Sequence, residues 1–281
     1  MAMETKRSLV LGGTGYLGQH LLQSLSETNC CVAYTYHSSS PLPCFLFPRA
    51  LGFHVDLGTG NGLDSILQEF GKPDVVVNCA AISIPRVCEN DPASAMSVNA
   101  STPFVDWLNS FSGEKPLLVQ LSTDQVYEGV KSFYREDEET RPINVYGKSK
   151  LASEQQIVKK YSNYAILRSS IIFGPQTAAP VPKSLPIQWI DDVLSKREPA
   201  AFFHDEFRCP VFVKDVVAVI LFLARKWISD GEQMKLLLNV GGPNRLSRAE
   251  MAEVVAKIRG YSTSLINQVS SSSVTKSSRI L

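Results

Sequence analysis

The sequence predicts an α/β protein with a doubly wound, mainly parallel sheet and a smaller C-terminal subdomain. Apolar strand-like runs alternate with helical patterns over residues 1–174, which is typical of parallel sheets. The first of these runs leads directly into a glycine-rich turn. A proline-rich segment over 175–186 marks the passage to a less regular part, placed mainly at 175–268. We expect the chain to return to the first domain around 207–228, and the Ser-rich residues 269–281 to form a frayed tail.

The composition is that of an ordinary soluble globule, with 44% hydrophobic and 20% charged residues in a chain of 281. Its 28 Lys and Arg nearly balance its 27 Asp and Glu, which argues against nucleic acid as a partner. No apolar run reaches the ~18 residues of a membrane helix. The first strand begins too early to leave room for a signal peptide, so we expect a cytoplasmic location. The six cysteines form no Cys-x-x-Cys pair and no zinc spacing, so we expect reduced thiols and no metal.

The glycine-rich turn at residues 12–18 reads Gly-Gly-Thr-Gly-Tyr-Leu-Gly and lies between the first strand and a helical pattern. This order is typical of a dinucleotide-binding loop, although a plain structural turn is the alternative. Gly12 would permit the tight turn, Gly15 the approach of a pyrophosphate, and Gly18 the close packing of helix and strand. The helix N-terminus would favour the anion. The expected cofactor contacts here are Gly12, Thr14, Gly15, Tyr16, Leu17 and Gly18.

The second expected strand, at residues 31–36, bears on the choice between NAD and NADP. A strand in this position ends in Asp or Glu in enzymes strict for NAD, because the carboxylate binds the ribose 2′-hydroxyl. Here it ends in Tyr36 and His37, followed by three serines, and no acid occurs between residues 30 and 48. That leaves room for a 2′-phosphate and favours NADP(H) over NAD(H). His37 would line this site, with an exposed loop histidine as the alternative.

The next two strands also end in candidate cofactor contacts. A short strand at 52–55 is followed by Asp56 and Leu57, which are placed to reach the adenine edge; a turn aspartate is the alternative. A buried strand at 74–78 follows later and breaks into a run of small residues. Small residues after a central parallel strand let a ligand lie against the backbone. We assign this role to Cys79, Ala80 and Ala81.

Three polar residues further along are candidates for the chemistry. A helix that begins at Asp91-Pro92 carries Asn99 in an apolar pattern, either as a buried strut or in a catalytic or cofactor-binding role. Ser122 and Thr123 follow a buried strand at 117–121. A hydroxyl pair at the carboxyl end of such a strand is well placed to hold a substrate oxygen, and a turn or cap is the alternative.

Tyr146 and Lys150 are four residues apart in a long helical pattern and therefore share one face of a helix. A lysine ammonium about 4 Å away could stabilise a phenolate by at most ~4 kcal/mol at an effective dielectric constant of 20. That corresponds to a tyrosine pKa lower by about 3, which makes the pair a sensible acid and base. Tyr127 and Lys131 have the same spacing, but Gly129 and loop-like residues around them argue against a helix.

These motifs, in this order, resemble the extended short-chain dehydrogenase/reductase superfamily over residues 8–258. Two groups match best: the dTDP-4-dehydrorhamnose reductases and the related regulatory beta subunit of methionine adenosyltransferase. The segments at 122–129 and 142–151 resemble their Ser-Thr-Asp and Asn-Val-Tyr-Gly-Lys motifs, and 207–216 and 239–243 resemble segments of their C-terminal half. The resemblance implies a Rossmann-type sheet with a small substrate-binding subdomain, a homodimer as one oligomeric state, and NADP(H).

The resemblance also implies roles for individual residues. Tyr146 would donate a proton to a substrate carbonyl as hydride arrives, and Lys150 would lower the Tyr146 pKa and hold the nicotinamide ribose. Thr123, with Ser122 as the substitute, would hydrogen-bond the same carbonyl oxygen. Arg208 would contact a substrate phosphate, since a guanidinium binds such oxygens bidentately; a surface salt bridge is the alternative.

Two departures from the reductases keep a second function open. Where they have a tryptophan this chain has Ile171, as in the regulatory subunits, so a rhamnose-type substrate is in doubt. The end at Leu281 suggests a shortened form of the substrate subdomain. The first hypothesis is an NADP(H)-dependent reductase of a 4-keto nucleotide sugar. The alternative is a non-catalytic, NADP(H)-binding regulator that docks on the methionine adenosyltransferase catalytic subunit.

Overall fold

The computed structural model describes residues 6–183 and 185–273, which divide into two compact units. Unit 1 holds the chain up to residue 168 together with two later segments, 176–181 and 214–239. Unit 2 holds the remaining segments, 169–175, 182–213 and the residues from 240 onward. Each unit has its own hydrophobic cluster, so each is described by itself.

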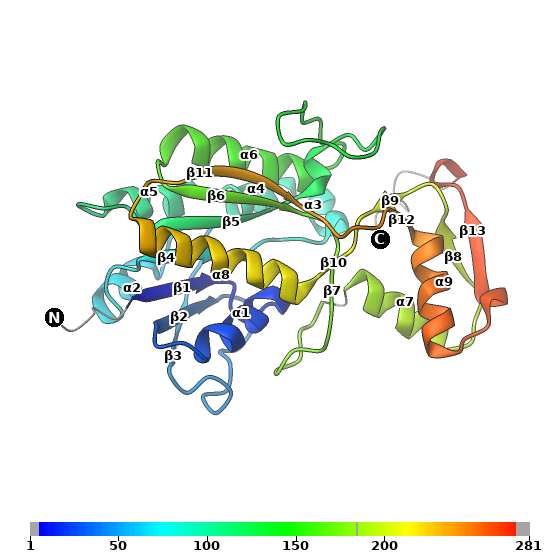
Figure 1. Cartoon of the computed structure of the whole chain (residues 1–281), viewed down its shortest axis with the longest axis horizontal. Coiled ribbons are helices and arrows are strands. Elements are labelled where there is room, and N and C mark those ends of the chain that lie inside the picture. Colours follow the sequence, from blue (N-terminus) through cyan, green and yellow to red (C-terminus); the bar gives the residue numbers. More distant parts are fainter. Residues whose placement is uncertain (1–5, 184, 274–281) are drawn as a thin grey trace. The chain divides into compact units, whose positions relative to one another are not determined.

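Within the described residues, unit 1 contains a seven-stranded sheet in the order β11-β6-β5-β4-β1-β2-β3. The pairs β1–β2, β2–β3, β1–β4 and β4–β5 all run parallel, which confirms the doubly wound parallel sheet (Figure 1). The order reverses at β1, and ligands of such sheets bind at this switch point, beyond the carboxyl ends of the strands. The strands are β1 (Arg7–Leu11), β2 (Cys31–Tyr36), β3 (Ala50–His54), β4 (Val75–Asn78), β5 (Leu117–Thr123), β6 (Tyr164–Ser169) and β11 (Lys235–Val240).

Helices cover both faces of this sheet. Figure 1 shows α4, α5 and α6 grouped on one side, while α1 and α8 run along the other. Their bounds are α1 (Tyr16–Ser26), α2 (Leu63–Glu69), α3 (Pro85–Asn90), α4 (Pro92–Asn99), α5 (Thr102–Ser110), α6 (Val145–Lys160) and α8 (Val213–Asp230), and a short 3-10 helix, η1, covers Asp124–Val126. The expected helices at Asp91-Pro92 and around Tyr146 are therefore present.

The central strands are buried along their whole length. Every residue of β4, β5 and β6 is buried, as expected for parallel strands covered on both faces. One apolar cluster joins these strands to α2, α5 and α6 through side chains such as Ile66, Leu108 and Ile157. This core holds the carboxyl ends of β1, β4 and β5 at one rigid edge, where the candidate residues lie.

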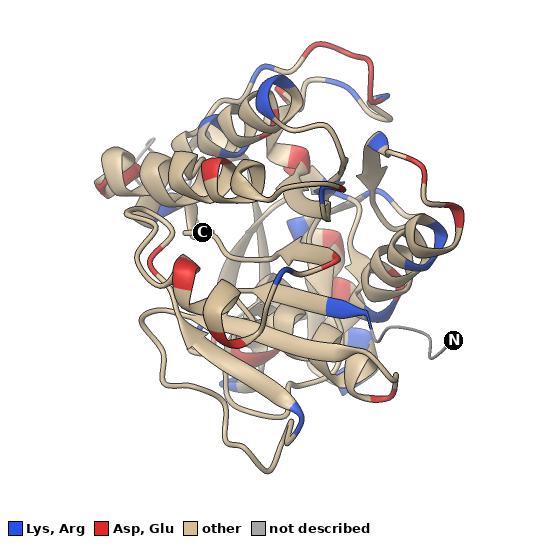
Figure 2. Cartoon of the chain, turned by 90° about the vertical axis from the view of Figure 1, so that its left-hand side faces the viewer, with Lys and Arg blue, Asp and Glu red and all other residues tan. Residues whose placement is uncertain are grey.

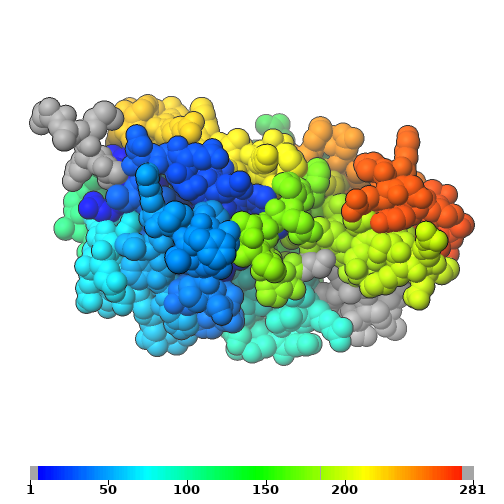
Figure 3. All heavy atoms as spheres, turned by 90° about the horizontal axis from the view of Figure 1, so that it is seen from below, coloured from blue at the N-terminus to red at the C-terminus, as the bar shows by residue number. Residues whose placement is uncertain are grey.

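Unit 2 is smaller and built from short strand pairs and two helices. The pairs are β7 with β10, β9 with β12 and β8 with β13. Figure 3 shows the yellow-green residues of α7 and β8 beside the orange residues of α9 and β13, from distant parts of the sequence. Trp189 packs edge-on against Phe202 in its core. The bounds are β7 (Ile172–Phe173), α7 (Pro186–Ser195), β8 (Ala200–Phe203), β9 (Phe207–Arg208), β10 (Val211–Phe212), β12 (Leu246–Ser247), α9 (Arg248–Arg259), η2 (Thr263–Leu265), β13 (Ile266–Val269) and η3 (Ser271–Ser273).

The end of the described chain is tied to unit 2 by polar contacts. Ser247 and Glu250 form a capping box at the start of α9, with hydrogen bonds of 3.1 and 2.6 Å. Val269 ends β13, and the Asp205 carboxylate accepts a hydrogen bond of 2.8 Å from the Ser271 amide. The expected frayed tail thus begins inside an ordered strand at residue 269, and its residues 274–281 lie outside the described part.

Charged residues of both signs are interspersed along the helices and loops on the side shown in Figure 2. This agrees with the near balance of charges in the sequence. In the described ranges, no helix combines the length and the apolar character that crossing a membrane requires.

Candidate functional site

The glycine turn after β1 is fixed by contacts that leave no room for side chains. Gly12 has a φ of +72°, and a Cβ there would lie 2.8 Å from the Ala80 Cα. A Cβ at Gly18 would lie 2.8 Å from the Gly13 Cα and collide with the Gly12 carbonyl oxygen. The Thr35 side chain accepts a hydrogen bond of 3.0 Å from the Gly12 amide. Gly12 therefore makes the tight turn and Gly18 the close helix–strand contact, as the sequence predicted.

Helix α1 begins at the edge of this turn with a glycine as its N-cap. Gly15 offers no side-chain cap, and the N-terminus of a helix favours an anion such as a pyrophosphate. Tyr16 and Leu17 are buried, and burial raises the pKa of Tyr16 to about 12. The Thr14 hydroxyl accepts a hydrogen bond of 2.8 Å from Ser39. The loop is thus tied to the residues that follow β2.

Gln19 binds the glycine turn to a distant segment of unit 1. Its side-chain amide donates to the carbonyl oxygens of Thr14 and Ala179 over 3.0 and 3.1 Å, and its oxygen accepts from the Ala179 amide over 2.8 Å. The segment 176–181 therefore lies against the start of α1. The sequence analysis did not single out Gln19, because only the fold reveals its partner 160 residues away.

The ends of β2 and β3 bring His37 and Asp56 into one region. His37 is exposed and stacks on His54 with ring centroids 5.6 Å apart. Asp56 accepts hydrogen bonds from the Gly58 amide and the Thr59 hydroxyl, over 2.8 and 2.9 Å. The Thr59 bond is the main cause of a lowered pKa of Asp56, to which His37 also contributes. Asp56 thus serves as a turn aspartate, one of the two roles considered, and Leu57 is buried in the core.

The small residues after β4 meet the glycine turn. Ala80 is the nearest neighbour of Gly12, and the Cys79 amide donates a hydrogen bond of 3.0 Å to the Leu11 carbonyl oxygen. Asn78 holds the Ala80 amide through its side-chain oxygen over 3.1 Å. Burial raises the pKa of the Cys79 thiol to about 12, so the thiol stays protonated at neutral pH. Ala81 continues this run at intermediate exposure.

Asn99 is a buried strut rather than a group directed at solvent. Its Nδ2 donates to the Ile82 carbonyl oxygen over 3.0 Å and to the Ser149 hydroxyl over 2.9 Å, and its Oδ1 accepts from the Ile82 amide over 2.8 Å. These bonds engage both ends of the amide. Asn99 therefore positions helix α6. This is the buried strut that the sequence analysis considered as the alternative to a catalytic or cofactor-binding role.

The two hydroxyls at the end of β5 have different partners. The Ser122 hydroxyl donates to the Glu154 carboxylate and is thus engaged within the protein. The Thr123 hydroxyl caps η1 by accepting from the Gln125 amide over 3.2 Å and donates to Asp124 over 3.4 Å, and it also lowers the pKa of the Tyr146 phenol, against the larger effect of burial. Thr123 therefore serves as a cap and also contacts the tyrosine. Of the pair, it is the residue better placed to share a substrate oxygen with Tyr146.

Tyr146 and Lys150 lie in α6 as predicted, but the expected lowering of the tyrosine pKa is wrong for this structure. Burial, with the negative charge of Asp124 next, raises the Tyr146 pKa above its usual value. Burial also lowers the pKa of Lys150 to about 8, against the opposing effects of Glu154 and Cys79. Desolvation disfavours the charged form of both side chains, and the charges that act on the Tyr146 phenol, those of Asp124 and Cys88, raise its pKa further. Tyr146 remains a protonated phenol at neutral pH.

Two charged residues that the sequence analysis missed complete this site. Glu154, one turn after Lys150 on α6, binds Arg168 at the end of β6 through a bond of 2.7 Å to Nη2. Both side chains are at most 5% exposed. Arg168 also donates to the Tyr127 hydroxyl over 2.7 Å. The i, i+4 spacing of Lys150 and Glu154 was a visible signal, but only the fold shows that both are buried.

The second Tyr-x-x-x-Lys pair and Arg208 have other partners. Tyr127 follows η1 and Lys131 lies in a turn, which confirms that this pair is not on a helix. Lys131 forms an ion pair with Glu138. Arg208, in unit 2, forms an ion pair with Glu206 at 3.2 Å. This is the salt bridge that the sequence analysis gave as the alternative to a phosphate contact.

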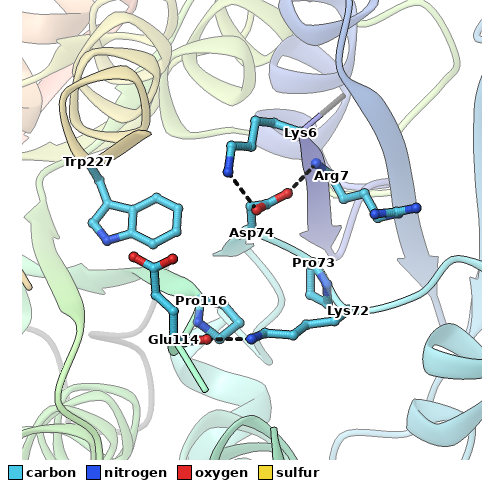
Figure 4. A pocket seen from close by; sticks show the side chains of 8 residues that line it. All are labelled: Lys6, Arg7, Lys72, Pro73, Asp74, Glu114, Pro116 and Trp227. Carbon is cyan, nitrogen blue, oxygen red and sulfur yellow. Dashed lines mark hydrogen bonds and ion pairs between the residues drawn. The ribbon is translucent and has the colours of Figure 1, made fainter. Parts of the chain in front are cut away.

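A cleft of about 270 Å³ opens at the opposite edge of the sheet, where β1, β4 and β5 begin (Figure 4). Three of the charged side chains that line it, those of Lys6, Asp74 and Lys72, are engaged by one another or by the backbone. Asp74 accepts from Lys6 Nζ over 3.1 Å and from the Arg7 amide over 2.8 Å, and Lys72 donates to the carbonyl oxygens of Ser112 and Glu114. The glycine turn, Thr123 and Tyr146 lie at the other edge of the sheet, where the parallel strands have their carboxyl ends.

Comparison with known proteins identifies relatives along nearly the whole chain. The family described as RmlD substrate binding domain matches residues 6–279. Methionine adenosyltransferase 2 subunit beta of Pongo abelii is 29% identical over 96% of this chain and 77% of its own length. A probable low-salt glycan biosynthesis reductase of Haloferax volcanii is 27% identical over 92% of this chain and 82% of its own length.

Solved structures of similar fold are reductases and epimerases. A hypothetical dTDP-4-dehydrorhamnose reductase from Sulfolobus tokodaii is 26% identical, with a TM-score of 0.75 over 94% of this chain and 85% of the other. A dTDP-4-dehydrorhamnose reductase from Bacillus anthracis, solved with NADP, has a TM-score of 0.76 over 97% and 87% of the two chains. At 21% identity, the second shows a shared fold alone.

Proposed function

Because the chain belongs to the RmlD substrate binding domain family of extended short-chain dehydrogenases/reductases, we propose that it is an NADP(H)-dependent reductase of a 4-keto nucleotide sugar. The single observation that carries this proposal is the closeness of the Thr123 hydroxyl to the Tyr146 phenol, on the helix that also carries the buried Lys150. A protonated phenol, a neighbouring hydroxyl and an ammonium are what the reduction of a carbonyl requires. We place the protein in the cytoplasm as part of the same proposal.

The residues at the carboxyl edge of the sheet fit a dinucleotide. A Cβ at Gly12 or Gly18 would fill the turn, and the N-terminus of α1, which has no side-chain cap at Gly15, would favour an anion. Gly12, Gly15 and the α1 terminus would hold the pyrophosphate, and Cys79 to Ala81 would lie against the nicotinamide half. The cofactor supplies the hydride. The absence of an acid after β2, with His37 and the serines in its place, supports NADP(H).

The protonation states of this site suit the proton transfer. Because burial raises the Tyr146 pKa, the phenol keeps its proton until a carbonyl oxygen develops negative charge beside it. Thr123 orients the same oxygen by a hydrogen bond. Lys150, with a pKa of about 8, is mainly charged at pH 7, so its ammonium stabilises the phenolate that forms and binds the ribose hydroxyls. Arg208 would hold a substrate phosphate if its ion pair with Glu206 opened.

The test is NADPH binding by fluorescence titration, followed by NADPH oxidation with a panel of 4-keto nucleotide sugars that includes dTDP-4-dehydrorhamnose. Tyr146→Phe should keep binding and lose turnover by about 10²–10⁴-fold, the usual contribution of a general acid. Lys131→Met, from the second Tyr-x-x-x-Lys pair, is the matched control and should retain full turnover. NADPH binding without turnover of any of these substrates would count against the reductase.

A second candidate function is a non-catalytic, NADP(H)-binding regulator of the methionine adenosyltransferase catalytic subunit. The curated relatives named as its beta subunit favour it, as does Ile171 in place of the reductases' tryptophan. If the chain is such a regulator, it should co-purify with that catalytic subunit and change the kinetics of the subunit. Tyr146→Phe should leave both effects unchanged. Separate elution of the two proteins at micromolar concentration would argue against this candidate.

A further inference from the structure

A buried carboxylate faces the lysine of the candidate site. Glu154 follows Lys150 by four residues on α6, so the two side chains are neighbours on one face of the helix. Both residues are 2% exposed. The Glu154 carboxylate accepts hydrogen bonds from Arg168, whose Nη2 and Nε lie 2.7 and 3.2 Å from Oε2, and from the Ser122 hydroxyl.

This arrangement fixes where the negative charge lies. Three donors from two strands, β5 and β6, hold the carboxylate, so its position next to the turn of α6 that carries Lys150 is fixed. The ion pair with Arg168 places a carboxylate charge at this point of the helix. The Ser122 hydroxyl, which was expected to contact substrate, thus helps to position this acid.

We propose that Glu154 is a positioning residue that keeps Lys150 charged and in place for the cofactor and for Tyr146. This inference rests on the proposed function, because the proposed function assigns Lys150 to the cofactor site. The Glu154 charge acts through Lys150, and Glu154 itself touches neither substrate nor cofactor.

The other titratable groups around α6 do not replace Glu154 in this role. Glu154 and Cys79 are the groups whose charge acts on Lys150, and the Cys79 thiol stays neutral because burial raises its pKa to about 12. On the neighbouring elements α3 and η1, Cys88 and Asp124 act on Tyr146. In the described part of the chain, Glu154 is therefore the ionised group that opposes the loss of the Lys150 proton.

The test measures the Lys150 pKa directly, by NMR titration of side-chain-labelled lysine in the whole chain. Glu154→Gln should lower that pKa by about 1 to 3, the usual effect of removing an adjacent opposite charge. The pH above which NADPH binding weakens should fall by the same amount. Asp124→Asn is the matched control: it removes a carboxylate that faces Tyr146, and it should leave the Lys150 pKa unchanged.

A second variant separates the charge effect from damage to the fold. Glu154→Gln alone leaves the Arg168 guanidinium buried without its partner, whereas the double variant Glu154→Gln/Arg168→Met removes both charges. Loss of the Arg168 charge works against loss of the Glu154 charge, so the Lys150 pKa should fall by less in the double variant than in Glu154→Gln. A wild-type Lys150 pKa in folded Glu154→Gln would overturn the proposal. Because this readout needs no turnover, a protein without reductase activity would refute the proposed function and still decide this inference.

Discussion

Asn99 on α4 donates a hydrogen bond of 2.9 Å to the hydroxyl of Ser149 on α6. Ser149 lies between Tyr146 and Lys150 in the sequence and donates in turn to the Tyr146 carbonyl oxygen over 2.8 Å. Because Asn99 also holds the backbone of Ile82, one buried amide joins the loop after β4 to the first turns of α6. The residues expected to bind the cofactor and those expected to transfer the proton are thus coupled.

A double-mutant cycle at this pair should show the coupling. Asn99→Ala should lower the free energy of unfolding by roughly 2–3 kcal/mol, because it deletes three hydrogen bonds of a buried side chain and leaves the Ile82 amide without its acceptor. Ser149→Ala should cost about 1 kcal/mol. In urea denaturation, the double variant should cost about 1 kcal/mol less than the sum of the two. Strictly additive costs would show that the bond between the two side chains contributes nothing.

The glycine turn should tolerate no side chain at Gly18. A Cβ there meets the Gly13 Cα at 2.8 Å, so Gly18→Ala must shift the backbone of the turn. We expect NADPH affinity to fall by about tenfold or more, since the amides that face the pyrophosphate move with it. Gly113→Ala is the control, with a φ of +70° but nothing within 4 Å of its Cβ. It should cost about 1–2 kcal/mol of stability and leave the NADPH dissociation constant unchanged. Equal affinities in the two variants would contradict this account.

Removing the Gln19 side chain should release the segment 176–181. Gln19→Ala deletes three hydrogen bonds of a residue that is 2% exposed, so we expect a loss of roughly 1–3 kcal/mol in the free energy of unfolding. Limited proteolysis should show faster cleavage within 176–181. Gln156→Ala removes an exposed bond to Thr102 and should change stability by less than about 0.5 kcal/mol. Unchanged cleavage in Gln19→Ala would mean that other contacts hold this segment.

Lys150 should make stability depend on pH in the alkaline range. Its pKa is about 8 in the folded chain and about 10.4 when unfolded, so the unfolded chain binds the extra proton between these values. Stability should therefore rise with pH in this window, by about 2–3 kcal/mol between pH 7 and 10. Lys150→Met lacks this contribution. The measurement is the difference in unfolding free energy between wild type and variant at both pH values, and a difference independent of pH would contradict the lowered pKa.

Most of the fold of unit 1 could be predicted from local sequence patterns. The glycine spacing at 12–18 predicted the turn, because glycines are needed there for tight backbone geometry. The apolar runs predicted the buried strands. Helix α7 at Pro186–Ser195 and strand β8 were not predicted. They lie in short segments of unit 2 whose partners are far away in the sequence, so no local period reveals them.

The electrostatics of the candidate site could not be predicted in the same way. Tyr146 and Lys150 were found from their spacing, but the direction of the tyrosine pKa depends on burial, which is a property of the folded chain. Arg168 ends an apolar strand and Glu154 sits in a polar helix pattern, so each looks unremarkable alone. Their pairing, and the engagement of Ser122 with Glu154, arise only when β5, β6 and α6 come together.

The separate cores of the two units give each one its own fluorescent reporter. The chain has three tryptophans, and Trp107 and Trp227 lie in unit 1 whereas Trp189 lies against Phe202 in unit 2. The Trp107 indole nitrogen is buried without a hydrogen-bond partner, so phenylalanine can replace this ring without breaking a polar contact. A chain that retains Trp189 as its single emitter would report the melting of unit 2 alone, and a chain that retains Trp107 would report that of unit 1. Whether NADPH raises one melting temperature or both would then show how far the ligand's stabilisation spreads through the molecule.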